Sequence, residues 1–270
     1  MRAADVAGEL RRLGVRASRG LGQNFLVDER VARRQVESAR IRPEETVLEV
    51  GPGLGVLTRL LSARAGRVVA IERDRRLAGA LAALGGNVEV VCGDALKVPW
   101  PAFEVMVSNL PYQISSPVTF RLLEEPFDRA VLMFQREFAE RVVAVPGTKD
   151  YSRLTVNVAH RAEASILERV PRSAFHPQPR VDSAVVRLVR RPPPYHVEDE
   201  AVFRAVVDAC FSHRRKTIAN ALDLAWQRFA PDRAAWREAM RGLPFLDRRP
   251  EALSPRGFAE LANRITGAKG

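Results

Sequence analysis

Short apolar runs rich in Val and Ile alternate with helical patterns between residues 46 and 134 of the sequence. The runs are TVLEV at 46–50, RVVAI at 67–71, VEVV at 88–91, EVMVS at 104–108 and AVLMF at 130–134. Continuous apolar runs of this length are typical of strands buried on both faces. The pattern therefore predicts an α/β protein with a doubly wound parallel sheet covered by helices.

Two later stretches, 154–159 and 183–189, also have an extended pattern, with no long helical pattern between them. They predict an antiparallel hairpin that closes one edge of the sheet. The run RRPPPY at 190–195 then interrupts regular structure, because proline fixes φ and removes a backbone donor. It predicts a domain boundary, with one domain over 1–192 and a second over 193–270.

The second domain has a different pattern. Residues 199–230 and 233–265 have the periodicity of amphipathic helices, broken only by prolines. No convincing strand pattern occurs there. The sequence thus predicts a small all-helical domain after the α/β domain.

The charge balance indicates a polyanionic partner. The chain has 43 Lys and Arg against 32 Asp and Glu, a formal net charge of +11. Most of the cations are Arg, whose planar guanidinium suits phosphate oxygens and base stacking. Nucleic acid is the favoured partner, and a basic enzyme without a polyanionic ligand is the alternative.

The cysteines and the apolar segments indicate the cell compartment in which the protein works. Cys92 and Cys210 lie far apart in unrelated contexts, so they predict neither a disulfide framework nor a metal cluster. The N-terminus lacks the apolar core of a signal peptide, and no segment has the roughly 20 apolar residues that cross a bilayer. We expect a cytoplasmic protein with no metal and no membrane contact.

A glycine loop follows the first strand directly. GPGLG places Gly51, Gly53 and Gly55 at a strand-to-helix turn, where a ligand can lie against the backbone. The dinucleotide fingerprint GxGxxG requires glycine at position 56, which is Val56 here. The spacing therefore disfavours a nicotinamide dehydrogenase.

Two carboxylates follow the next two strands. Glu72 lies 21 residues after Gly51, where a carboxylate can accept hydrogen bonds from both hydroxyls of a ribose. Asp94 follows the third strand, and we expect it to reach an adenine amino group. Either residue could be a solvated loop residue, but with the glycine loop they predict a nucleoside-containing cofactor at one rim of the sheet.

The fourth strand ends in SNLPYQISSPV, which indicates the reaction. Asn109 to Tyr112 resembles the motif of amino-methyltransferases that act on adenine, cytosine or glutamine amides. An exocyclic amine is a poor nucleophile, and the side-chain oxygen of Asn109 and the carbonyl of Leu110 are candidate acceptors for its hydrogens. Tyr112 is a candidate stacking surface for a flipped or unpaired base. A simple proline-induced turn is the alternative.

Five sequence blocks extend this resemblance over nearly the whole chain. They are LGQNFLVD at 21–28, EVGPGLGVLT at 49–58, NLPYQISSPV at 109–118, FHPQPRVDSAVVRL at 175–188 and FSHRRKTIANAL at 211–222. The chain resembles the small-subunit rRNA dimethyladenosine transferases. The resemblance implies a Rossmann-like class I S-adenosylmethionine-dependent methyltransferase domain with a small helical RNA-recognition domain. It also implies transfer of methyl groups to two adjacent adenosines near the rRNA 3′ end, within an immature small subunit.

The resemblance also implies roles for individual residues. Asn24, Leu26, Gly51, Gly53, Glu72, Asp94 and Asn109 would contact S-adenosylmethionine. Phe175 would be a second stacking surface beside Tyr112, with an ordinary core aromatic as the alternative. Arg214, Arg215 and Lys216 resemble a basic helix that faces rRNA phosphates, although they could be only a solvated face.

Other functions stay open on the sequence. A large-subunit rRNA methyltransferase of the antibiotic-resistance type shares several of these features, although the HRRKTIANAL block favours the small-subunit enzymes. A non-catalytic ribosome assembly factor could keep the fold and the cofactor pocket. A DNA adenine methyltransferase is disfavoured because the chain shows no separate sequence-reading domain. We expect the protein to be a monomer.

Overall fold

The computed structural model describes residues 3–15 and 23–267, and its chain divides into two compact units. The first unit is Met1–Glu140 with Glu163–Arg190, and the second is Arg141–Ala162 with Arg191–Gly270. Among the described residues, none of the helices combines the length and the apolar character that crossing a bilayer requires.

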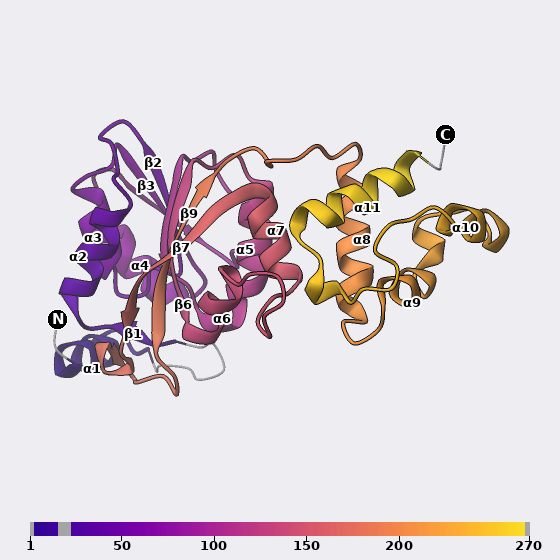
Figure 1. The fold of residues 1–270 in the computed structure, drawn as a ribbon. Helices are drawn as coiled ribbons and strands as arrows, with labels where there is room; N and C mark the ends of the chain where they lie inside the picture. Colours follow the sequence, from indigo (N-terminus) through magenta and orange to yellow (C-terminus); the bar gives the residue numbers. More distant parts are fainter. Residues whose placement is uncertain (1–2, 16–22, 268–270) are drawn as a thin grey trace. The chain divides into compact units, whose positions relative to one another are not determined.

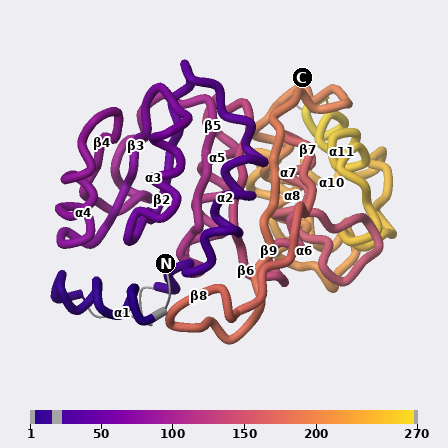
Figure 2. The backbone as a smooth tube through the Cα atoms, turned by 90° about the vertical axis from the view of Figure 1, so that its left-hand side faces the viewer, coloured from indigo at the N-terminus to yellow at the C-terminus, as the bar shows by residue number. Residues whose placement is uncertain are grey.

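The first unit is built on a seven-stranded sheet (Figure 1), and its strands follow the order β4-β3-β2-β5-β6-β9-β7, which can be traced in Figure 2. Its strands are β2 Thr46–Val50, β3 Arg67–Glu72, β4 Val88–Cys92, β5 Val105–Asn109, β6 Arg129–Gln135, β7 Ala162–Val170 and β9 Ser183–Arg190. The first five pair in parallel and β9 pairs antiparallel with β6. The predicted α/β class, the five parallel strands and the antiparallel edge are confirmed.

One predicted strand is wrong. Residues 154–159 belong to helix α7, Arg153–Arg161, and the strand that completes the edge is β7. Ser152 begins the helix with a capping box formed with Thr155, and Leu154 and Val158 are buried one helical turn apart. Burial of one helical face therefore determines the structure of this segment, which the sequence pattern had predicted to be extended.

Helices cover both faces of the sheet. They are α2 Glu29–Ser38, α3 Val56–Ser62, α4 Arg75–Ala82, α5 Ser115–Glu124 and α6 Arg136–Val142. Val47, Val107 and Val131 pack with side chains of α2 and α3 in one cluster, while their neighbours along the strands are buried on the opposite face. Figures 1 and 2 show α2 and α3 on one side of the sheet and α5 on the other. This arrangement explains the nearly continuous apolar runs.

A two-stranded sheet lies beside the main one. Strand β1, Phe25–Leu26, pairs antiparallel with β8, Phe175–His176, and joins segments 150 residues apart in the sequence. Helix α1, Ala3–Arg12, packs its Val6 and Leu10 with Phe25 in a separate apolar cluster. The pairing of β1 with β8 is not predicted by either short segment alone.

The second unit is helical. After α7 come α8 Glu200–Ser212, α9 Ile218–Asp223, α10 Arg233–Met240 and α11 Pro255–Gly267, around a core that includes Tyr151, Phe203, Trp236 and Phe258. One division between the units, after Arg190, lies close to the boundary predicted at residue 192. The segment Arg141–Ala162 also belongs to the second unit, which was not predicted, because α7 shares its core with α8 and α11. The predicted helices over 199–230 and 233–265 are shorter and more broken than expected.

Candidate functional site

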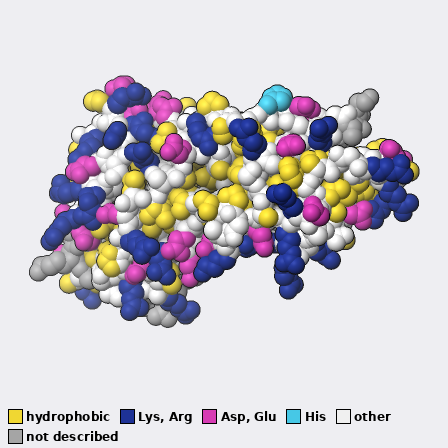
Figure 3. Space-filling view, in the orientation of Figure 1, with side chains coloured by type: hydrophobic (Ala, Val, Ile, Leu, Met, Phe, Trp, Pro, Cys, Tyr) yellow, Lys and Arg dark blue, Asp and Glu magenta, His cyan; other side chains and the backbone are white. Residues whose placement is uncertain are grey.

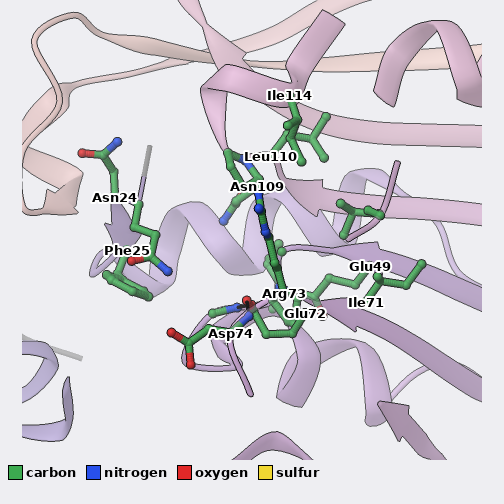
Figure 4. Close-up of a pocket in the computed structure, with 18 of the residues that line it drawn as sticks. Asn24, Phe25, Glu49, Ile71, Glu72, Arg73, Asp74, Asn109, Leu110 and Ile114 are labelled. Carbon is green, nitrogen blue, oxygen red and sulfur yellow. Dashed lines mark hydrogen bonds between the residues drawn. The ribbon is translucent and has the colours of Figure 1, made fainter. Parts of the chain in front are cut away.

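A cavity opens at the carboxyl ends of the parallel strands of the first unit (Figure 4). The chain turns from β2 outward to β3 and β4 and then crosses to β5, so β2 and β5 border the point where the strand order reverses. Ligands of doubly wound folds bind in the crevice at this point. The cavity is lined by ten of the residues predicted from the sequence, namely Asn24, Leu26, Gly51, Gly53, Glu72, Asp94, Asn109, Leu110, Tyr112 and Phe175.

The glycine loop forms one wall of the cavity. Gly51 and Gly53 have φ angles of 70° and 59°, which favour glycine. A Cβ on Gly51 would lie 2.9 Å from the ring of Pro111, and one on Gly53 would lie 3.1 Å from the ring of Phe25. Both glycines are therefore required by the backbone and by close packing around the cavity, in addition to any contact with a ligand.

Glu72 ends β3 with a nearly buried carboxylate. Its Oε2 accepts a hydrogen bond from the Gly53 amide at 3.1 Å, and its Oε1 accepts one from the Asp74 amide at 2.9 Å. Burial raises the pKa of Glu72 above its ordinary value. Each oxygen has a further lone pair, so the carboxylate fixes the glycine loop and can still accept hydrogen bonds from two hydroxyls.

Asp94 follows β4 and offers one oxygen to the cavity. Its Oδ1 accepts a hydrogen bond from the Leu96 amide at 3.0 Å. Its Oδ2 lies 3.9 Å from a guanidinium nitrogen of Arg73, whose side chain is mostly exposed. That distance is at the limit of an ion pair, so Oδ2 can accept a hydrogen bond from a ligand amine.

Glu49 is a cavity residue that the sequence reasoning did not single out. It is 2% exposed, and its Oε2 accepts a hydrogen bond from the Thr58 hydroxyl at 2.7 Å. Burial, together with the nearby carboxylate of Glu72, raises the pKa of Glu49 to about 8. The signal in the sequence was a lone carboxylate inside the apolar strand TVLEV.

Asn109 is the last residue of β5 and has an unusual buried oxygen. Its Oδ1 is buried and has no hydrogen-bond partner among the described residues. Figure 4 shows Asn109 and Leu110 on the opposite side of the cavity from Glu72 and Asp74. A buried acceptor without a donor is unfavourable in the ligand-free protein. Its position in the cavity suits a ligand that supplies an N–H group.

Tyr112 and Phe175 bring two aromatic rings to the cavity from different segments. Tyr112 begins the short turn η2, Tyr112–Ile114, and its hydroxyl lies 2.6 Å from the hydroxyl of Ser183. Burial raises the pKa of Tyr112, so its phenol stays neutral. Phe175 is 3% exposed and packs in the core shared with α2 and α3, as the alternative for it predicted, while its stacking on a base stays a prediction.

Strand β1 carries the QNFL segment to the same cavity. Leu26 pairs with Phe175, and Val27 donates its amide hydrogen to the Ala174 carbonyl at 2.8 Å, which ties the segment to β8. Asn24 lies next to Phe25 at one side of the cavity in Figure 4. Asp28 caps α2 by accepting from the Arg30 amide, as its residue type predicts. Leu21 and Gly22 of this block lie outside the described residues.

The basic residues of the HRRK motif lie in the second unit. They form the turn between α8 and α9, so the expected basic helix is wrong. Arg214 pairs with Glu251 at 2.9 Å and donates to the Thr148 carbonyl, whereas Arg215 and Lys216 are exposed. His213 and Thr217 interrupt the helical pattern, and Thr217 caps α9. Arg214 thus joins two loops of its own unit and is less available to a partner.

A second pair of cations lies beside this turn. The Ile218 amide, at the start of α9, donates to the Arg248 carbonyl at 2.8 Å, so the loop bearing Arg248 and Arg249 runs alongside. Both arginines are exposed, as are Arg215 and Lys216. Figure 3 shows other Lys and Arg side chains gathered at the α10 end of this unit. The four exposed cations therefore come from two segments that are distant in the sequence, 215–216 and 248–249.

The cavity brings together carboxylates, an unpartnered amide oxygen and aromatic rings. The carboxylates of Glu72 and Asp94, at the end of β3 and just after β4, are suited to ribose and adenine hydrogens, and β5 ends with the acceptor Asn109 close to an aromatic ring. No histidine lines the cavity among the described residues. The arrangement can hold two ligands and align them, which suits group transfer by positioning.

Comparison with known protein families and sequences identifies relatives of this chain. Residues 14–233 match the model of the family described as ribosomal RNA adenine dimethylase. A protein of Thermococcus gammatolerans, named probable ribosomal RNA small subunit methyltransferase A, is 47% identical over 92% of this chain and 88% of its own length. One of the same name from Methanopyrus kandleri is 45% identical over the full length of both chains.

Solved structures resemble the chain as well. A dimethyladenosine transferase from Plasmodium falciparum has a TM-score of 0.78 and 29% identity, covering 91% of this chain and 98% of that one. The 23S rRNA methyltransferase ErmE has a TM-score of 0.65 and 36% identity, covering 90% of this chain and 100% of that one. Both are similar over nearly the whole fold.

Proposed function

Because the chain belongs to the ribosomal RNA adenine dimethylase family, we propose that it methylates two adjacent adenosines near the 3′ end of small-subunit rRNA. The methyl donor is S-adenosylmethionine, the acceptor is the exocyclic amine, and the product is dimethyladenosine. The substrate is RNA within an immature small subunit, and the protein acts as a cytoplasmic monomer.

The chemistry of the cavity fits the methyl donor. Glu72 has lone pairs for the two ribose hydroxyls, and Asp94 has an oxygen for the adenine amine. Gly51 and Gly53 leave the backbone bare beside them, and Asn24 and Leu26 line the far side. When bound, the donor supplies a methyl group on a positively charged sulfur.

The single observation that carries the proposal is the unpartnered Oδ1 of Asn109. An exocyclic amine donates its hydrogens, and two acceptors at Asn109 and the Leu110 carbonyl would favour a tetrahedral nitrogen with an available lone pair. Tyr112 and Phe175 would hold the base ring by stacking. The residues therefore bind and orient the amine in line with the methyl group.

Methyl transfer does not require a strong base in the protein. The amine, held by the acceptors at Asn109 and Leu110, would use its lone pair to form a bond to the methyl carbon as the carbon–sulfur bond breaks, which would leave a neutral thioether. The methylated nitrogen is then positively charged and loses a proton to solvent. A second transfer to the same nitrogen requires that the methylamine rotate and again donate a hydrogen to an acceptor at Asn109 or Leu110.

RNA recognition is assigned to the second unit, with residues 193–270 as its main part. Lys and Arg outnumber Asp and Glu in this unit. Arg215 and Lys216, with Arg248 and Arg249 beside them, are exposed and suited to phosphate contacts. Arg214 supports this surface through Glu251.

The test is transfer of labelled methyl to unmodified small subunits, large subunits and duplex DNA. Label in the small-subunit RNA alone supports the proposal. Label in large-subunit RNA favours the activity named for ErmE, to which the chain is 36% identical. Tight binding to small subunits without transfer indicates an assembly factor and contradicts the proposed reaction.

A further inference from the structure

Ser183 lies in the block FHPQPRVDSAVVRL, which also contains Phe175, but it does not contact the target amine in the proposed reaction. It is the first residue of β9 and is fully buried. Its hydroxyl oxygen lies 2.6 Å from the hydroxyl oxygen of Tyr112, 71 positions earlier in the chain. The two residues therefore share a short hydrogen bond between β9, which lies between β6 and β7 in the sheet, and the turn that follows β5.

Ser183 is held more firmly than Tyr112. It pairs with Gln135 in the antiparallel ladder of β6 and β9. The preceding residue, Asp182, accepts hydrogen bonds from the Arg136 amide at 2.9 Å and from the Arg172 amide at 3.0 Å. Ser183 and Asp182 are thus held by the β6–β9 ladder, by the Asp182 carbonyl and by the Asp182 side chain, all within the first unit.

Tyr112 lies on a weaker element. The turn η2 has only three residues, and no side chain caps its start. A stacking ring can slide or tilt when only its faces are in contact, because stacking is tolerant of geometry. A hydrogen bond from the end of the ring to a rigid strand removes that freedom.

We propose that Ser183 is a positioning residue that sets the orientation of the Tyr112 ring, and through it the target base. The inference rests on the proposed function, in which Tyr112 stacks on the flipped adenine. Ring and base then meet the Asn109 acceptor in one orientation. Loss of the bond should slow transfer without weakening cofactor binding, because Glu72 and Asp94, the residues proposed to hold the cofactor, lie at the end of β3 and after β4.

The test is a double-mutant cycle of Ser183→Ala and Tyr112→Phe. Either change removes the same hydrogen bond and keeps the aromatic ring, so each should slow single-turnover methyl transfer about three- to tenfold. The double variant should be no slower than the slower single one. Ser183→Thr keeps the hydroxyl and should recover part of the rate. The affinity for S-adenosylhomocysteine, measured by calorimetry, should stay within about twofold of wild type.

Ser115→Ala is the matched control, because Ser115 is also a buried serine but its hydroxyl has no partner among the described residues. It should leave the transfer rate unchanged. A lower melting temperature for Ser183→Ala with a wild-type rate, or losses for the two single variants that add in the double one, would overturn the positioning role.

A second readout separates this inference from the proposed function. RNA with 2-aminopurine at the target position is titrated with each protein, since stacking on an aromatic ring quenches the probe. Absence of methyl transfer by the wild type refutes the proposed reaction. Quenching by the wild type that is weaker with both Ser183→Ala and Tyr112→Phe still supports the positioning role. No quenching by the wild type, or equal quenching by all proteins, refutes it.

Discussion

Asn109→Ala should separate activity from stability. The Oδ1 of Asn109 is buried without a donor among the described residues, so the substitution removes an acceptor that the folded protein does not use. Leaving a buried polar group unsatisfied costs about 1–3 kcal/mol. The residue lines the cavity, so its removal enlarges an existing space and leaves no closed void in the core. We therefore expect a melting temperature equal to or above that of the wild type.

The rate of methyl transfer by Asn109→Ala should fall, although the melting temperature does not. Loss of one preorganised hydrogen-bonding group at a reaction centre typically costs about 3–4 kcal/mol, or a factor of about 10²–10³ in kcat. The assay is single-turnover transfer of labelled methyl to unmodified small subunits at saturating enzyme. RNA binding, measured by filter retention, should stay near wild type because the exposed cations of the second unit are unaffected.

Two outcomes would refute this reasoning. Turnover of Asn109→Ala within a few-fold of wild type would remove the side-chain oxygen from the reaction. A large fall in melting temperature would show that Asn109 stabilises the fold, so that lost activity would say nothing about the amine. Asn109→Asp is the informative companion, because it keeps an acceptor of nearly the same shape and should retain more activity than alanine.

Three further predictions concern charge. The double variant Arg215→Ala, Lys216→Ala should weaken RNA binding and make the slope of log affinity against log salt shallower by about two, and an unchanged slope would contradict phosphate contacts by these residues. Arg214→Ala should instead lower the melting temperature, because Arg214 pairs with Glu251. Glu72→Gln should weaken S-adenosylhomocysteine binding about 10- to 100-fold in calorimetry, and equal affinity would exclude the ribose contact. The pKa of Glu49 is raised to about 8 from 4.5, so its stabilisation is complete below pH 4.5 and is lost as pH rises toward 8. Denaturant unfolding should show wild type losing up to about 1.4 kcal/mol per pH unit there relative to Glu49→Gln, and parallel curves would refute the raised pKa.

The sequence predicted the parts of the site that local chemistry determines. Gly51 and Gly53 require positive φ, and Glu72 and Asp94 follow apolar strands whose carboxyl ends meet at one rim. These features depend on strand order and side-chain type, and both can be read from the chain. The same holds for Asp28, which caps α2 as its residue type indicates.

The remaining features depend on contacts that are distant in sequence. The α7 segment alternates like a strand, but its apolar face is buried against α8, which no local pattern reveals. The bond from Tyr112 to Ser183 joins β9 to the turn after β5. Arg214 differs from Arg215 only because Glu251 reaches it from another loop. Spacing alone cannot show such partners.

The most direct test of the account is mass spectrometry of nuclease fragments from small-subunit RNA after incubation with the protein and S-adenosylmethionine. We predict two adjacent dimethyladenosines near the 3′ end with the wild type, and neither with Asn109→Ala over the same time. Unmodified fragments with the wild type, or methyl groups on ring nitrogens or ribose, would contradict the central claim.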